Sequence, residues 1–271
     1  MLRNYIEKIS GIYTGFDYTI VEGEMKHIPR KEVTGSTKDM SFVLEDIHFV
    51  ATRQLFLGGL LGGGFFGRDV WLTATHYPSF HLFQNIYNVQ KAIILTRNPY
   101  DSLFSFFNLL VSGQHDVSLS EEMLKDSMEE FREMVRLSIT DWKYSYEWWR
   151  SQQIPTHIIR YEDIILQPVE TLRSMFEFLL DEPNLIGSPI ETRIKQIVEA
   201  SIVIPVNTSV EEKPSKDTRV IYKPRSGRIH GAFDRFDEEL KKEIFNQLEE
   251  FLRDFCYINN GPLNRQRFFD V

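Results

Sequence analysis

Apolar residues near the start of the chain recur at the spacing of an α-helix. Leu2, Tyr5, Ile6 and Ile9 fall at i, i+3, i+4 and i+7, which places them on one helical face. Gly11 follows directly, and glycine is the residue type that most often ends a helix in a left-handed turn. The pattern predicts an amphipathic helix over the first ten residues.

Three short apolar runs lack the helical period and predict β-strands. They are Val70–Thr75, Ala92–Thr96 and Thr156–Arg160. The second run is apolar at successive positions without alternation, which is typical of a strand that is buried on both faces in a parallel sheet. We expect these strands to belong to the interior of one sheet.

Helical spacing returns in the longer stretches around these runs. Helices are predicted from Pro99, over a long region from 120 to 150, over 169–180 and over 238–255. Strands therefore alternate with helices, which is typical of an α/β fold. We expect a central, largely parallel sheet flanked by helices, in a single domain that spans residues 1–271.

Composition narrows the classes of protein that fit. The 31 Lys and Arg residues are outnumbered by 39 Asp and Glu residues, and the formal net charge of −8 argues against a general nucleic-acid binder. The single cysteine, Cys256, excludes an internal disulfide framework and a cysteine-based zinc site. No apolar run approaches 18 residues, so no membrane span is predicted in this chain.

The stretch ILTRNPYDSLFSFF changes from strand to helix within three residues and carries an arginine at the junction. Asn98 suits the N-cap and Pro99 the first helical position, and Asp101 is spaced to reach back to the cap. A helix that starts at the carboxyl edge of a sheet offers N–H groups and a partial positive charge to an anion. Arg97 adds a full charge, and Ser105 adds a hydroxyl one turn beyond Asp101. The alternative is that Arg97 pairs with a carboxylate and the Asn-Pro pair merely starts the helix.

Two further segments carry groups that suit a nucleotide. Tyr161 follows the strand that ends at Arg160, and an exposed ring at that edge can pack on a nucleobase, although such a tyrosine alone is more often core or rim. Lys223–Arg228 carries three cations and a glycine within a polar loop, a pattern that alone usually marks a solvated surface patch. In a chain of net charge −8, three separate segments suited to anions call for a common explanation.

The segment from Arg97 to Ser105 resembles the 3′-phosphate-binding segment of the sulfotransferases that use 3′-phosphoadenylyl sulfate (PAPS). The resemblance implies that Arg97 and Ser105 hold the 3′-phosphate, and that Tyr161, in a tyrosine-acid-acid segment, contacts the adenine. It implies the P-loop-like architecture of that family. Arg225, Ser226 and Gly227 resemble the family's late basic-glycine loop, which closes over the same phosphate.

The same resemblance implies a catalytic base. Thr75-His76 is similar to the family's Lys-Thr-His segment, in which the histidine takes the proton of the acceptor hydroxyl. A histidine titrates near pH ~6.5, which suits this work at neutral pH. Ala74 stands where the family has a lysine, so one cation near the sulfuryl group is absent or supplied from elsewhere. Without the resemblance, His76 is read more readily as a capping or hydrogen-bonded core histidine.

The start of the chain departs from the family pattern. The segment Ile6–Gly15 resembles the branch of WSC-domain-containing sulfotransferases, but no cysteine-rich WSC module is present in this chain. The helix over the first ten residues matches the helix that follows the family's 5′-phosphosulfate loop, so that loop and the first strand are not in the sequence. We expect Met1 to be an internal methionine of an N-terminally truncated chain; the competing hypothesis is a genuine chain that has lost catalysis.

The resemblance implies transfer of a sulfuryl group from PAPS to a hydroxyl on a small molecule or glycan, with no metal. The alternative is a catalytically inactive, sulfotransferase-like nucleotide-binding or scaffold protein. A weaker rival is a P-loop-like kinase, which would prefer ATP to a 3′-phosphorylated nucleotide. We expect a cytoplasmic location for the chain as given, and a Golgi or membrane location if a further N-terminal segment precedes it.

Overall fold

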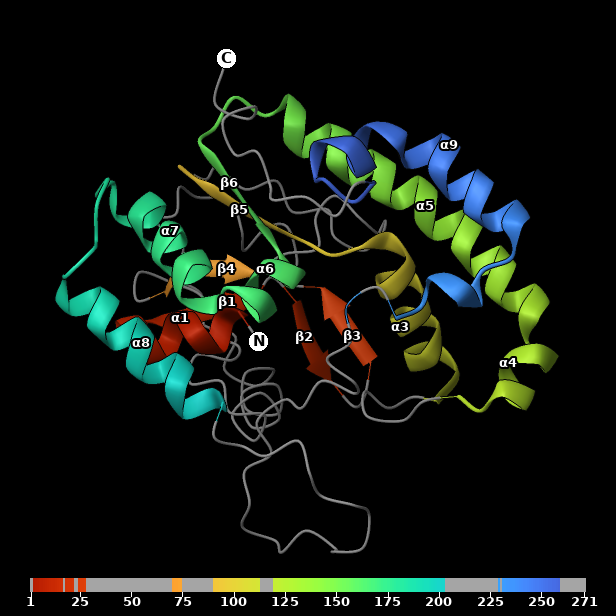
Figure 1. Cartoon of the computed structure of the whole chain (residues 1–271), viewed down its shortest axis with the longest axis horizontal. Helices are drawn as coiled ribbons and strands as arrows, with labels where there is room; N and C mark the ends of the chain where they lie inside the picture. The colour runs from red at the N-terminus through yellow and green to blue at the C-terminus, as the bar shows by residue number, and fades with distance from the viewer. Residues whose placement is uncertain are drawn as a thin grey trace, which may run out of the picture. The chain divides into compact units, whose positions relative to one another are not determined.

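The chain divides into two compact units, each assembled from two stretches of sequence (Figure 1). The first unit comprises residues 1–89 and 168–223, and the second comprises 90–167 and 224–271. Whether the two units form one domain stays a prediction. The structure is a computed structural model, and it describes residues 2–16, 18–21, 24–27, 70–74, 90–112, 119–202, 229 and 231–258.

The first unit begins with the predicted amphipathic helix. Helix α1 spans Leu2–Ser10 and ends at Gly11, whose φ of 72° is the left-handed conformation expected of a glycine cap. Ile6 is buried, as its place on the apolar face predicts. The buried carboxylate of Glu7 accepts both the backbone N–H of Thr14, at 3.0 Å, and its hydroxyl, at 2.6 Å. These two bonds fix α1 against the strand that follows.

Four of the described strands lie in this unit, in two pairs. β1 (Tyr13–Phe16) and β4 (Val70–Ala74) are parallel, whereas β2 (Tyr18–Val21) and β3 (Glu24–His27) are antiparallel. The strand predicted over Val70–Thr75 is thus confirmed. The described part of the region between α1 and β4 contains β1, β2 and β3.

Two helices complete the described part of the first unit. α7 spans Pro168–Leu180 and confirms the helix predicted over 169–180. α8 spans Pro189–Ile202 and was not predicted. Glu191, in the first turn of α8, accepts the N–H of Gly187 at 2.8 Å and a guanidinium N–H of Arg173 at 2.9 Å, which joins α8 to α7.

The second unit contains the remaining described strands, paired in parallel. β5 (Ala92–Thr96) and β6 (Thr156–Arg160) match the two predicted runs, and their register places Ala92 opposite Thr156 and Thr96 opposite Arg160. The expectation that the first of these strands is buried on both faces was wrong, because the side chain of Leu95 is 49% exposed. The described strands form three two-stranded sheets, two of them parallel, which is consistent with an α/β fold, and the single central sheet stays a prediction.

Helices of the second unit pack around an aromatic-rich core. The long helical region divides at Ser127 into α4 (Glu121–Asp126) and α5 (Met128–Ser151). The other helical elements are α3 (Pro99–Ser112), α6 (Tyr161–Leu166), a 3₁₀ turn (Phe233–Arg235) and α9 (Glu238–Asp254). The buried core includes Leu103, Phe107, Phe131, Val135, Ile139, Phe236, Leu240, Ile244, Leu248, Phe251 and Phe255.

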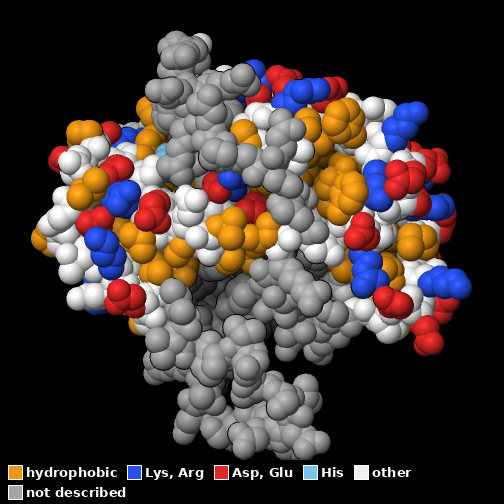
Figure 2. Space-filling model, viewed as in Figure 1, with side chains coloured by type: hydrophobic (Ala, Val, Ile, Leu, Met, Phe, Trp, Pro, Cys, Tyr) orange, Lys and Arg blue, Asp and Glu red, His pale blue; other side chains and the backbone are white. Residues whose placement is uncertain are grey.

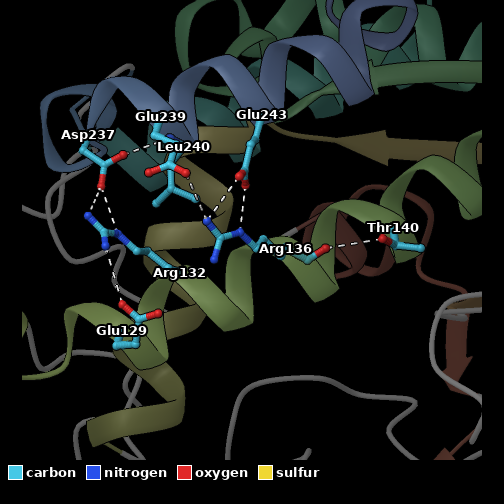
Figure 3. Close-up of polar contacts among 8 residues, drawn as sticks. All are labelled: Glu129, Arg132, Arg136, Thr140, Asp237, Glu239, Leu240 and Glu243. Carbon is cyan, nitrogen blue, oxygen red and sulfur yellow. Dashed lines mark hydrogen bonds and ion pairs between the residues drawn. The ribbon is translucent and has the colours of Figure 1, made fainter.

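Helices α5 and α9 lie side by side and are joined by ion pairs along their shared edge (Figures 1 and 3). Asp237 caps α9 by accepting the N–H of Leu240 at 2.9 Å, and the same carboxylate accepts Arg132 of α5 at 2.6 Å. One turn further along α5, Arg136 donates to both oxygens of Glu243. Basic and acidic side chains are therefore interspersed over this surface rather than gathered by sign (Figure 2).

Candidate nucleotide site at the β5–β6 edge

The register of β5 and β6 brings Arg97 and Tyr161 together. Thr96 and Arg160 are the last paired residues of the two parallel strands, so Arg97 and Tyr161 are the next residues on neighbouring chains at the carboxyl edge. Neighbouring strands are about 4.8 Å apart. The guanidinium carbon of Arg97 lies over the Tyr161 ring, 4.6 Å from its centroid. Two of the residues predicted for the site are thus in direct contact.

The hydrogen-bonding groups of Arg97 are not used by the described part of the chain. Its Nε is buried and has no hydrogen-bond partner. Among the described residues no carboxylate forms an ion pair with Arg97, so the structural alternative raised for this arginine finds no support there. A buried donor without an acceptor costs on the order of 1–3 kcal/mol, and an anion in the plane of the guanidinium would remove that cost.

The first turn of α3 is capped by Asn98, as predicted. The side-chain oxygen of Asn98 accepts the N–H of Tyr100 at 3.0 Å, as expected of an N-cap. Asp101 was expected to reach back to the cap, which stays a prediction, and one of its carboxylate oxygens accepts the N–H of Ala232 at 2.9 Å. The N–H of Asn98 donates to Glu162, at 2.9 Å. Glu162 comes from α6 and performs the part that a capping box assigns to the third helical residue.

These bonds limit what the start of α3 offers to an anion. Pro99 has no N–H, and the N–H of Tyr100 is already bound to Asn98. The helix dipole still places a partial positive charge at this end. The guanidinium of Arg97 is therefore the main hydrogen-bond donor that the described residues bring to this edge.

Glu162 also ties this edge to the last described turn of the chain. Its second carboxylate oxygen accepts the hydroxyl of Tyr257 at 3.0 Å, and both residues are buried. Burial, followed by the neighbouring charge of Glu162, raises the pKa of Tyr257, so its hydroxyl remains protonated and donates. Nothing in the local sequence pattern pointed to Tyr257, which lies 95 residues away from its partner.

An arginine immediately before Tyr161 fixes the backbone from which that ring projects. Arg160 donates to both oxygens of Asp163, at 2.9 and 2.6 Å, and also to the carbonyl of Phe255 at 3.2 Å. The residues on either side of Tyr161 are therefore both anchored, Arg160 through this pair and Glu162 through Asn98 and Tyr257. The tyrosine-acid-acid segment thus supplies one ring at the edge and two carboxylates that hold the surrounding chain.

Of the other predicted site residues, only Ser105 lies among the residues that the structure describes. Ser105 is partly buried on α3, six residues after Pro99 and thus roughly 9 Å along the helix axis. His76, Arg225, Ser226 and Gly227 lie outside the described residues, and their roles stay predictions. Over the described ranges, no cluster of three or more His, Cys, Asp or Glu side chains has the arrangement of a metal site. In the same ranges no helix has both the length and the apolar character needed to span a membrane.

Comparison with models of protein families identifies a known domain in this chain. The model of the sulfotransferase domain matches residues 69–253, which is more than half of the chain. The chain belongs to the sulfotransferase family. The matched range includes all of the predicted site residues, from His76 to Gly227. No curated protein sequence matches the chain.

Membership of this family confirms the resemblance read from the segment between Arg97 and Ser105 at the level of the family. It makes the protein a transferase enzyme whose reaction class is the transfer of a sulfuryl group. The parallel strand pairs and surrounding helices are consistent with the α/β class of the sulfotransferase domain.

Proposed function

We propose that this sulfotransferase takes its sulfuryl group from PAPS and transfers it to a hydroxyl acceptor, with the donor's 3′-phosphate held at the β5–β6 edge. The observation that carries the proposal is the state of Arg97. Its guanidinium lies over Tyr161, and its Nε is buried without a hydrogen-bond partner. An arginine in this state fits a phosphate, because the planar fork donates to two oxygens of one anion.

The neighbouring groups fit the remainder of a 3′-phosphorylated nucleotide. In the proposal, the hydroxyl of Ser105 donates to the same phosphate, and the ring of Tyr161 contacts the adenine. The positive end of the α3 dipole adds to the attraction of the phosphate. Because the chain carries a net charge of −8, this attraction has to come from such a local group and not from the protein as a whole.

The late basic loop is proposed to close over the same phosphate with Arg225, Ser226 and Gly227. One described contact supports this. Ala232 is five residues after Gly227, and its N–H is bound to Asp101, four residues from Arg97. Five residues of chain span at most about 18 Å. The anchor at Asp101 thus permits the loop to reach the phosphate site.

For the chemical step, His76 is proposed as the general base. It would take the proton of the acceptor hydroxyl while the acceptor oxygen forms its bond to sulfur. The bond from sulfur to the 5′-phosphate oxygen breaks in the same step, and adenosine 3′,5′-bisphosphate leaves with that electron pair. A neutral imidazole is suited to this near pH 7.

The proposal also covers the acceptor and the branch of the sulfotransferase family. The segment Ile6–Gly15 supports placement with the WSC-domain-containing sulfotransferases, and we propose a small molecule or glycan that presents a hydroxyl as the acceptor. Transfer of ³⁵S from labelled PAPS to a panel of hydroxylated glycans and small molecules would identify it.

The same assay tests the proposal as a whole. Arg97→Ala should raise the KM for PAPS, and His76→Ala should lower kcat with little change in that KM. Arg253→Ala, which removes an exposed α9 arginine, is the matched control and should change neither constant. If adenosine 3′,5′-bisphosphate binds but His76→Ala leaves the rate unchanged, the assignment of the base is wrong. If the bisphosphate binds and no acceptor is sulfated, the inactive nucleotide-binding alternative replaces the proposal. Preference for ATP over PAPS would favour the kinase alternative.

A further inference from the structure

The contact between Arg97 and Tyr161 follows directly from the strand register, and both side chains are partly buried. A cation over the face of a tyrosine ring is attracted by the ring's quadrupole, and the attraction grows as the pair is removed from water. The guanidinium carbon lies 4.6 Å from the ring centroid, and the buried Nε has no hydrogen-bond partner among the described residues. The ring therefore restrains the arginine without consuming its hydrogen bonds.

The segment that carries the Tyr161 ring is anchored by hydrogen bonds on both sides. Tyr161 is the first residue of α6, and it lies between two residues that are bonded to distant parts of the unit. Arg160 is held by Asp163 and by the carbonyl of Phe255, and Glu162 is held by Asn98 and Tyr257. A ring mounted on such a segment can fix the direction of a flexible arginine side chain.

We infer that Tyr161 is a positioning residue for Arg97, and that it thereby sets the selectivity of the site for nucleotides that carry a 3′-phosphate. This inference rests on the proposed function, in which Arg97 binds that phosphate. Holding the guanidinium in place before the ligand arrives lowers the entropy that is lost on binding. The benefit belongs only to ligands that use Arg97.

Support of Arg97 by Tyr161 and contact of the Tyr161 ring with the adenine predict different effects on the binding of two nucleotides. Adenosine 3′,5′-bisphosphate and AMP share the adenine and the 5′-phosphate, and they differ in the 3′-phosphate. Loss of a contact with the adenine weakens both ligands equally. Loss of a support for Arg97 weakens the bisphosphate alone, so it adds to any shared loss and lowers the ratio of the two affinities.

The experiment is calorimetric titration of both ligands into the wild-type protein and into single and double variants. Tyr161→Leu should lower the preference for the bisphosphate over AMP about threefold to thirtyfold, in addition to any loss that both ligands share through the adenine. Tyr161→Phe keeps the ring and should preserve the wild-type ratio of the two affinities. In the Arg97→Ala background, Tyr161→Leu should have no further effect that depends on the 3′-phosphate. Tyr144→Leu on α5, where the tyrosine is exposed, is the matched control.

The outcomes distinguish the positioning role of Tyr161 from the proposed binding of the 3′-phosphate by Arg97. Equal losses for both ligands in Tyr161→Leu, with the ratio still dependent on Arg97, would overturn the positioning role and leave the proposed function intact. A ratio that does not change in Arg97→Ala would overturn both. If Tyr161→Leu does not fold, Tyr161→Met removes the ring while keeping its bulk, and Arg97→Lys tests the same contact from the other side. The inference requires both of these variants to lose preference for the bisphosphate.

Discussion

The carboxylate of Glu162 accepts the backbone N–H of Asn98 at 2.9 Å, although the two residues are 64 positions apart in the sequence. The bond extends the pairing of the two parallel strands two residues beyond their last paired residues, Thr96 and Arg160. Arg97 and Tyr161 lie between that last pair and this bond. The segment that carries the proposed phosphate site is therefore fixed on both sides.

Replacing Glu162 should destabilise the protein. Glu162→Ala leaves the N–H of Asn98 and the hydroxyl of Tyr257 buried without their acceptor, at about 1–3 kcal/mol for each group. We expect a total loss of at least about 2 kcal/mol in the free energy of unfolding, measured by urea denaturation. Glu162→Gln should cost less, because its amide oxygen still accepts from Asn98 and its NH₂ group can donate to the tyrosine oxygen. Glu249→Ala, at an exposed site, is the control, and equal midpoints for Glu162→Ala and this control would contradict the account.

The carboxylate of Asp237 has two separable roles, as N-cap of α9 and as partner of Arg132 (Figure 3). Asp237→Ala removes both and should cost about 1–2 kcal/mol. Asp237→Asn keeps the cap and loses the charge, so its smaller cost should shrink further in 1 M salt, which screens exposed ion pairs. Thermal unfolding at two salt concentrations measures both effects. A cost for Asp237→Asn that matches the cost for Asp237→Ala would show that capping contributes little.

Glu191 should make the stability of the first unit depend on pH in acid. The N–H of Gly187, followed by the guanidinium of Arg173, lowers the pKa of Glu191 to about 2. Its usual pKa, near 4.3, applies to the unfolded chain. The charged form is thus favoured by folding, and its stabilising effect is present above about pH 4.5 and lost as the pH falls toward 2.

The measurement is the difference in melting temperature between the wild-type protein and Glu191→Gln. Groups that titrate in both proteins cancel in this difference. The wild type should melt at a higher temperature at pH 6, and the gap should close between about pH 4.5 and pH 2. Glu182→Gln, at an exposed position of the same unit, is the control. A gap that stays constant down to pH 2.5 would show that the charge of Glu191 does not contribute.

The meeting of Arg97 and Tyr161 could be predicted from the sequence, because each residue directly follows an apolar run and parallel strands end at the same edge. The bonds that hold them could not. The capping-box rule considers only the third residue of the helix, which is Asp101. The acceptor of the Asn98 N–H is Glu162, which comes from α6. Asp101 also binds Ala232, a partner that no local pattern indicates.

The missed helix has a different explanation. In α8, Ile190, Ile194 and Val198 follow helical spacing, and the last two are buried, so the signal was present in the sequence. In contrast, the exposure of Leu95 could not be read from its apolar run, because periodicity reports the character of a strand and not how many elements cover it.

The central claim is that Arg97 recognises a 3′-phosphate. Its most direct test is the ratio of the dissociation constants of AMP and adenosine 3′,5′-bisphosphate, measured by calorimetry for the wild type and for Arg97→Ala. A charge-assisted contact of about 1.5–3 kcal/mol corresponds to a preference for the bisphosphate of about 10-fold to 150-fold. The account predicts this preference in the wild type and its loss in Arg97→Ala. Equal affinity for the two ligands in the wild type, or a preference that survives in Arg97→Ala, would contradict it.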